Sequence, residues 1–290
     1  MTGPGEPRLV AFDLDGTLLD RNGQVPPRTR AALDLLRDRG VRCVLASGRN
    51  PLGMIRLCTE LGLDGPQIAM QGALLISPIS GEILTAWRLD GARVREHLAF
   101  AREIAANALL CFPDGFKAER LTPEVEALFL PFEEPLPEIV PSLDELADRG
   151  PIKTFVATAP GRHEESWQAA RTRFAGRSAV TTGDEHSLEL LPLGANKGLA
   201  LRTLAEHLGI PLAQVAAVGD ARNDIEMLQV SGRSAAMAQA RPEVRAAAGL
   251  VVPSNHEEGV LVALDAFFPS LGLIRPVAPP SGGRPATMED

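Results

Sequence analysis

The sequence is poor in cysteine, and it has no long hydrophobic run. Its three cysteines, Cys43, Cys58 and Cys111, are odd in number and far apart in apolar surroundings, which predicts reduced core thiols of a cytoplasmic protein. No two of them have the spacing of metal ligands. The first residues carry no signal-peptide hydrophobic region, and no apolar stretch is long enough to cross a bilayer, so we expect no membrane partner.

Positive charge is also scarce, since the net charge is −8 at pH 7. This balance argues against a nucleic-acid partner, although a metal ion and a few local cations can still make one pocket attractive to an anion. Only three of the 29 basic residues are lysines, Lys117, Lys153 and Lys197. Because arginine is the usual basic residue of this chain, a position that holds lysine is a mild indication of a specific role. The length of 290 residues allows one large domain or two ordinary ones, and we expect a monomer or a homodimer.

Apolar strand-like segments alternate with helix-like segments in two stretches, residues 1–82 and 189–272. The expected strands are 9–13, 41–46, 67–70, 215–218, 235–237 and 250–252, and the expected helices are 27–39, 51–61, 197–208, 221–230, 242–248 and 259–267. Such alternation predicts βαβ units and a parallel sheet covered on both faces. We therefore expect an α/β protein with a Rossmann-like core.

The pattern changes between residues 83 and 188. Helix-like segments at 91–106 and 164–174 alternate there with strand-like segments at 108–112, 152–157 and 179–182, and prolines between 131 and 141 mark an irregular connection. We interpret this stretch as an α+β module inserted into the core. The residues 273–290 are rich in proline and glycine, which predicts a disordered tail.

Two aspartates, Asp13 and Asp15, stand at the end of the first expected strand. Residues i and i+2 of an extended chain face the same side, so both carboxylates can point into one space. Two such charges repel unless a cation lies between them or one is protonated. The pair is thus either a metal-assisted nucleophile with an acid–base neighbour or an ordinary Asp-rich turn.

Three more loops carry polar residues just beyond an expected strand or at a helix start. Ser47 and Gly48 offer a hydroxyl and an accessible amide, suited to a phosphate oxygen or simply to starting a helix. Lys197 opens a helix, where the dipole disfavours a cation. It either holds a phosphoryl oxygen or is a solvated surface lysine. Ligands of open α/β sheets bind at the carboxyl edge of the strands.

The last of these loops follows the strand 215–218. It places Asp220 at the strand tip and Asn223 and Asp224 in the next helical turn. Together with Asp13 and Asp15, Asp220 provides the oxygen ligands that Mg²⁺ prefers. Asp224 alone could be only an acidic residue at a helix N-terminus.

The ordered set of motifs resembles the haloacid dehalogenase superfamily of phosphotransferases. The motifs are Asp13-x-Asp15-Gly-Thr-Leu-Leu, Ser47-Gly-Arg, Lys197-Gly and Gly219-Asp220-x-x-Asn223-Asp224, and the long insert resembles the Cof-like branch. The sequence departs from the family pattern in three loops, at Gln71-Gly72-Ala73, Ala238-Gln239 and Glu257-Glu258-Gly259. The first two departures put contacts of the pocket loops in doubt.

The resemblance implies a role for each motif residue. Asp13 would be the nucleophile that forms an aspartyl-phosphate, Asp15 the general acid and base, and Lys197 the cation that holds the phosphoryl group. The phosphate would also contact Thr17, Ser47, Gly48 and Asn223, with Thr17 and Ser47 alternatively ordering the first loop. Mg²⁺ would bind Asp13, the main-chain carbonyl of Asp15, Asp220 and, in support, Asp224.

The resemblance further implies a phosphatase of small phosphorylated metabolites, with sugar phosphates as the leading class. The insert would be a cap that excludes water and selects the leaving group. Its polar residues Lys153 and Arg120 are candidate substrate contacts or, alternatively, surface residues. Two other functions stay open: a sugar phosphomutase on the same scaffold and a non-catalytic metabolite-binding module.

Overall fold

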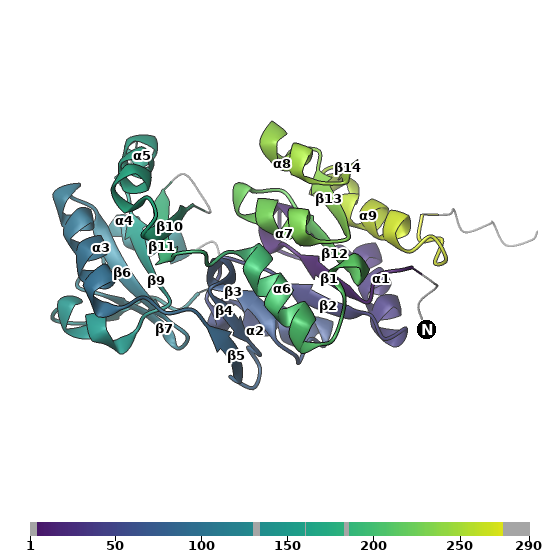
Figure 1. Ribbon diagram of the computed structural model, residues 1–290, viewed down its shortest axis with the longest axis horizontal. Coiled ribbons are helices and arrows are strands. Elements are labelled where there is room, and N and C mark those ends of the chain that lie inside the picture. Colours follow the sequence, from purple (N-terminus) through teal and green to yellow (C-terminus); the bar gives the residue numbers. More distant parts are fainter. Residues whose placement is uncertain (1–4, 130–133, 160, 183–185, 275–290) are drawn as a thin grey trace, which may run out of the picture.

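The structure is a computed structural model, which describes residues 5–129, 134–159, 161–182 and 186–274. Two bodies built on separate sheets lie side by side (Figure 1). Most of the tail expected to be disordered, residues 275–290, lies outside the described residues. No helix among the described residues is both long and apolar enough to traverse a bilayer.

The first body is built on a five-stranded sheet in the order β14-β13-β12-β1-β2, with every neighbouring pair parallel. The strands are β1 (Leu9–Phe12), β2 (Arg42–Leu45), β12 (Val215–Gly219), β13 (Arg233–Met237) and β14 (Leu250–Val252). Since β1 and β12 are neighbours, the chain segments that follow them start side by side at one edge of the sheet. The expected α/β class with a parallel core is confirmed.

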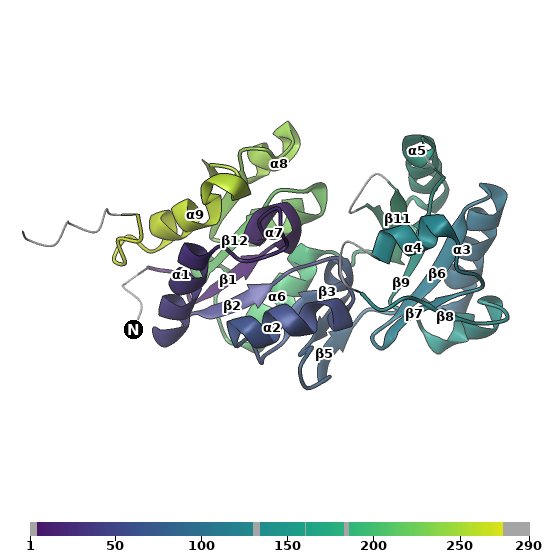
Figure 2. The ribbon, with the colours of Figure 1, turned by 180° about the vertical axis from the view of Figure 1, so that it is seen from behind.

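Helices cover both faces of this sheet because its strands are apolar on both sides. Val10 and Phe12 of β1 pack in one cluster with residues of α1 and α9, whereas Leu9 and Ala11 pack in another with residues of α6 and α7. Figure 1 shows α6 and α7 in front of the sheet, and Figure 2 shows α1 and α2 in front. The six helices are α1 (Pro27–Asp38), α2 (Ile55–Leu61), α6 (Lys197–His207), α7 (Ile225–Val230), α8 (Pro242–Ala247) and α9 (Gly259–Phe267).

The second body, called the second domain below, is built on a six-stranded sheet in the order β10-β11-β9-β6-β7-β8. Its pairs are antiparallel except for the short pair β7–β8. The strands are β6 (Asn107–Phe112), β7 (Gly115–Ala118), β8 (Glu138–Ile139), β9 (Lys153–Ala157), β10 (Ser178–Thr181) and β11 (Ser187–Pro192). The helices are α3 (Gly91–Glu103), α4 (Pro123–Phe129) and α5 (His163–Phe174).

The two bodies meet at a small antiparallel sheet of β3 (Gln67–Ala69), β4 (Leu74–Ile76) and β5 (Ile83–Ala86). A parallel bridge between Ala46 and Ile68 attaches β3 to the core. The strand β5 pairs with β4 in this small sheet, and the chain enters the second domain after it. Residues 187–190 of β11 pair with β9 in the sheet of the second domain, and the chain then continues into α6 of the core.

Candidate active site

The first loop of the candidate site begins where β1 ends, at Asp13. The backbone then makes a tight turn over Leu14–Leu18, in which Gly16 has a φ of +84°. A Cβ on Gly16 would lie 2.5 Å from Oδ2 of Asp220, so this loop approaches the neighbouring one as closely as only glycine allows. Thr17 is buried and donates a hydrogen bond to Oδ1 of Asp220 at 2.9 Å. This hydrogen bond connects the first loop to the loop that follows β12.

Lys197 is fully buried at the start of α6. Its Nζ donates to Oδ1 of Asp13 and to Oδ1 of Asp224, both at 2.6 Å. Burial disfavours the ammonium form, but the two carboxylates outweigh it and hold the pKa of Lys197 above its ordinary value. The reading of Lys197 as a solvated surface lysine is therefore wrong.

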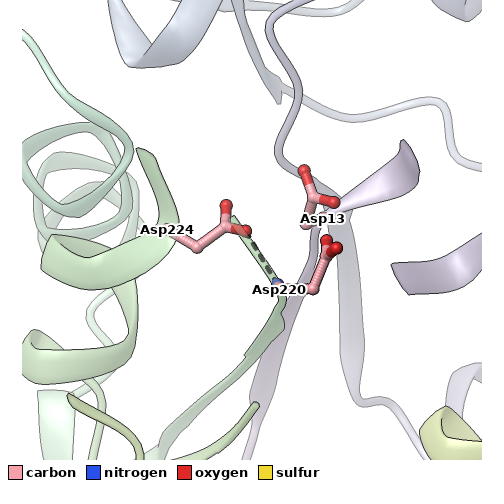
Figure 3. A group of neighbouring side chains, drawn as sticks. All are labelled: Asp13, Asp220 and Asp224. Carbon is pink, nitrogen blue, oxygen red and sulfur yellow. Dashed lines mark hydrogen bonds between the residues drawn. The ribbon is translucent and has the colours of Figure 1, made fainter. Parts of the chain in front are cut away.

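Three aspartate side chains lie close together at this site, as Figure 3 shows. Asp13, Asp220 and Asp224 each bring a carboxylate oxygen within 4.8 Å of the other two. Oδ2 of Asp13 is buried and has no hydrogen-bond partner. Burial and then repulsion from Asp224 raise the pKa of Asp13 well above its ordinary value, and the same causes raise the pKa of Asp220 to about 6. An orphaned buried oxygen among clustered carboxylates fits a bound divalent cation.

Both oxygens of Asp224 already have partners. Oδ1 accepts from Lys197, and Oδ2 accepts from the backbone N–H groups of Asp220 and Ala221, each at 3.0 Å. Figure 3 shows the bond to Asp220 as a dashed line. Asp224 thus connects Lys197 to the backbone of the loop that carries Asp220.

The carboxylate of Asp15 is not part of this cluster and pairs with Arg49. The guanidinium binds it through two nitrogens, Nη2 to Oδ1 at 2.6 Å and Nε to Oδ2 at 3.1 Å. Such a two-point ion pair is geometrically specific. Arg49 belongs to the Ser47-Gly-Arg motif, but the sequence alone offered no reason to assign a role to this arginine.

The other expected phosphate ligands lie around the same space. Ser47 accepts from the backbone N–H of Arg49 at 3.2 Å, and Asn223 donates through Nδ2 to Oε1 of Gln71 at 2.6 Å. Oδ1 of Asn223 is buried without a partner. A Cβ on Gly48 would lie 2.3 Å from Nε2 of Gln71, so glycine is required there for the two loops to touch.

A cavity of about 110 Å³ lies between the core and the second domain. The second domain lines it with Phe116, Glu134, Lys153 and Glu189. The core lines it with residues from four segments, which are Asp13 and Asp15, residues 47–49, Gln71, and Ala221 with Asn223. Lys153 is buried, and its Nζ donates to Oε2 of Glu189 at 2.6 Å and to the carbonyl of Gly48 at 2.9 Å.

The structure separates the two residues that were expected to contact substrate from the insert. Lys153 reaches the cavity, whereas Arg120 is exposed, bonds Oδ1 of Asn107 at 2.8 Å and lines a different hollow in the second domain. Glu189 was not foreseen. The sequence feature that could have indicated Glu189 is its position as the single charged residue within the apolar strand Ser187–Pro192. Lys153 is likewise the single charged residue of its strand.

A parallel sheet with acidic loops at its carboxyl edge, a buried lysine and a second domain over the cavity defines an α/β enzyme that acts on an anionic group. Comparison with known proteins gives the family. The sequence profile of the haloacid dehalogenase-like hydrolases matches residues 10–264. The chain belongs to this family, as the motifs indicated.

The chain is 34% identical over 241 residues to "HMP-PP phosphatase" of Serratia proteamaculans, an alignment that covers 82% of this chain and 86% of that protein. It is 29% identical over 269 residues to "Endoribonuclease YBEY, chloroplastic" of Arabidopsis thaliana, where 88% of this chain corresponds to only 45% of that longer protein. Among solved structures, a haloacid dehalogenase-like hydrolase from Bacteroides thetaiotaomicron has a TM-score of 0.80 at 27% identity, covering 91% of this chain and all of that one.

Proposed function

We propose that this protein is a Mg²⁺-dependent phosphatase that hydrolyses small phosphorylated metabolites through an aspartyl-phosphate at Asp13. Family membership and the phosphatase among the relatives support the reaction class. The single observation that carries the mechanism is the pair of oxygens on Asp13. One accepts from Lys197, and the other is buried without a partner among three carboxylates.

The residues present fit a magnesium ion, which would be held by Asp13 and Asp220 together with the main-chain carbonyl of Asp15, and Asp224 would support it. When bound, the ion would neutralise charge on the carboxylates and on the phosphate. Lys197 would hold a phosphoryl oxygen and keep Asp13 ionised. Ser47 and the amide of Gly48 would position the phosphate from the second loop.

The reaction then proceeds in two displacements. An oxygen of Asp13 attacks phosphorus, the bond to the leaving alcohol breaks, and Asp15 gives its proton to the departing oxygen. Asp15 then removes a proton from water, which attacks phosphorus and releases inorganic phosphate with Asp13 restored.

The small, polar cavity and its contacts from the second domain support a compact, hydroxyl-rich leaving group such as a sugar. We further propose that the protein works in the cytoplasm. The three cysteines are buried free thiols, and burial raises the pKa of Cys43 and of Cys58 to about 12, which keeps them unreactive.

The test is release of inorganic phosphate from a panel of phosphorylated metabolites, with Mg²⁺ and with a chelator. Asp13→Asn is the active-site variant, and Asp34→Asn, which changes an exposed aspartate of α1, is the matched control. We expect turnover that needs Mg²⁺, is lost in Asp13→Asn and persists in the control. Phosphate release without a bisphosphate activator would exclude the mutase. Unchanged turnover in Asp13→Asn would refute the nucleophile, and no turnover on any compound would favour the binding module.

A further inference from the structure

Gln71 occupies an unusual backbone position between β3 and β4. Met70 and Gln71 have φ values of 49° and 59°, and Gly72 follows with 88°. Side-chain-bearing residues rarely adopt this left-handed region, and asparagine does so more readily than most others. This backbone conformation therefore disfavours glutamine. A contact made by its side chain, which is longer than that of asparagine, must offset the cost.

The side chain of Gln71 joins the two bodies of the molecule. Its Nε2 donates to Oε1 of Glu189 on β11 at 2.9 Å, and its Oε1 accepts from Nδ2 of Asn223 in the catalytic loop at 2.6 Å. Gln71 and Glu189 are both buried. An asparagine would be one methylene shorter and could not keep both bonds from the same backbone position.

The charges of the second domain decide which way each amide faces. Oε2 of Glu189 is held by the ammonium of Lys153, so its Oε1 offers only an acceptor to Gln71. Gln71 therefore turns its N–H₂ toward Glu189 and its carbonyl toward Asn223. Asn223 in turn donates to Gln71, which leaves its own Oδ1 without a partner.

We propose that Gln71, held by Glu189 of the second domain, is a positioning residue that fixes the amide orientation of Asn223. Asn223, Gln71 and Glu189 line the same cavity as Asp13, so the orientation of that amide acts on the reacting groups. The effect on turnover rests on the phosphatase function proposed above. The contact among Glu189, Gln71 and Asn223 does not depend on that function.

A donor–acceptor exchange tests this contact. Gln71→Glu places two buried carboxylates against each other, and Glu189→Gln sets an amide N–H₂ against either Lys153 or Gln71. In the double variant, the new amide at position 189 can accept from Lys153 and donate to the new carboxylate at position 71. That carboxylate can still accept from Asn223. Gln71→Met removes the amide at equal length. Gln67→Met is the matched control, since Gln67 is also buried but bonds only the backbone of Leu45 and Gly65.

We would measure kcat and KM with Mg²⁺ and p-nitrophenyl phosphate, and thermal unfolding of the same proteins. Losing a hydrogen bond to a charged group predicts a fall in kcat/KM of about tenfold to a hundredfold in each single variant and in Gln71→Met. The double variant should recover to within about threefold of the wild type, and Gln67→Met should lie within the same range.

A double variant no better than the worse single one would overturn the proposal, and so would wild-type kinetics in Gln71→Met. Lower melting temperatures with unchanged kcat and KM would assign Gln71 a purely structural role, which also overturns it. If the wild type hydrolyses no substrate, the proposed function fails. The exchange would then be judged from the melting temperatures, where recovery in the double variant still demonstrates the contact between Gln71 and Glu189.

Discussion

Replacing Lys197 by methionine isolates the charge that holds the acidic cluster together. Methionine is similar in length to lysine and suits a fully buried position, so the change removes mainly the ammonium group. The carboxylates of Asp13 and Asp224 then lose the cation that lies 2.6 Å from each of them. Asp220 lies within 4.8 Å of both and adds further repulsion.

The cost follows from these contacts. A hydrogen bond to a charged group contributes about 1.5–3 kcal/mol, so two of them give about 3–6 kcal/mol. Breaking a buried ion pair by removing one partner costs about 3–5 kcal/mol, which agrees. Protonation of a carboxyl group relieves part of this, so we expect a loss of about 3 kcal/mol at neutral pH, or roughly 10 °C in Tm.

The loss should depend on pH and on metal in a defined direction. The pKa of Asp13 is already raised in the wild type, mainly by burial and then by Asp224, and loss of the ammonium raises it further. The folded state then holds a proton that the unfolded state has lost, so the variant gains stability as the pH falls toward 5. Added Mg²⁺ should restore part of the Tm by supplying positive charge to the cluster.

Thermal unfolding of wild type and Lys197→Met, with Mg²⁺ and with a chelator at two pH values, checks this. Lys153→Met is the control because it breaks a comparable buried pair with Glu189, outside the aspartate cluster. We expect a Tm loss there that Mg²⁺ does not reverse. Equal Tm values for Lys197→Met and wild type in chelator would refute the charge-balance explanation, as would a loss that grows on acidification. Phosphatase activity should fall at least a hundredfold.

Three further changes have defined outcomes. Asp13→Asn should abolish turnover yet raise the Tm in chelator, since it removes one of the mutually repelling charges; a lower Tm would contradict this. Burial lowers the pKa of His97 to about 3, so the unfolded state alone binds the proton and the contribution of His97 to stability falls as the pH drops from about 6.5 toward 3. Urea titrations at pH 7 and 5 should show the wild type losing about 2 kcal/mol relative to His97→Gln, and an equal change in both proteins would contradict this. Gly72→Ala would place a Cβ 2.3 Å from the backbone of Asn196 at a φ of 88°, so we expect a lower Tm and less soluble protein than wild type, measured by calorimetry.

The sequence predicted the parallel core because its strands are apolar on both faces and are separated by amphipathic helices. The order of motifs along the chain also predicted which loops would meet. Asp13 and Asp220 follow strands that are neighbours in the sheet, and Lys197 opens the helix that packs beside them. The side-chain contacts of Lys197 and Asp224 then follow from short distances between adjacent loops.

Contacts across the two bodies could not be predicted in this way. The pairing of Gln71 with Glu189 joins residues 118 positions apart on different sheets, and no local pattern encodes that separation. The assignment of a strand to one sheet or the other depends on such distant partners too. The strand Ser187–Pro192 is mostly apolar, which fits an antiparallel sheet as well as a parallel one, and only its partner β9 decides between them.

The scarcity of lysine can now be explained in structural terms. Two of the three lysines are buried, Lys153 in the wall of the cavity and Lys197 against Asp13. Each bridges two acceptors that come from different parts of the chain. A compact ammonium with three donors can bridge such acceptors in a tight space, whereas the planar guanidinium is larger and directs its donors differently. Lys197→Arg should therefore lose activity nearly as completely as Lys197→Met although its charge is kept. Wild-type kcat/KM in Lys197→Arg would show that charge alone, without the shape of the ammonium, is what the cluster requires.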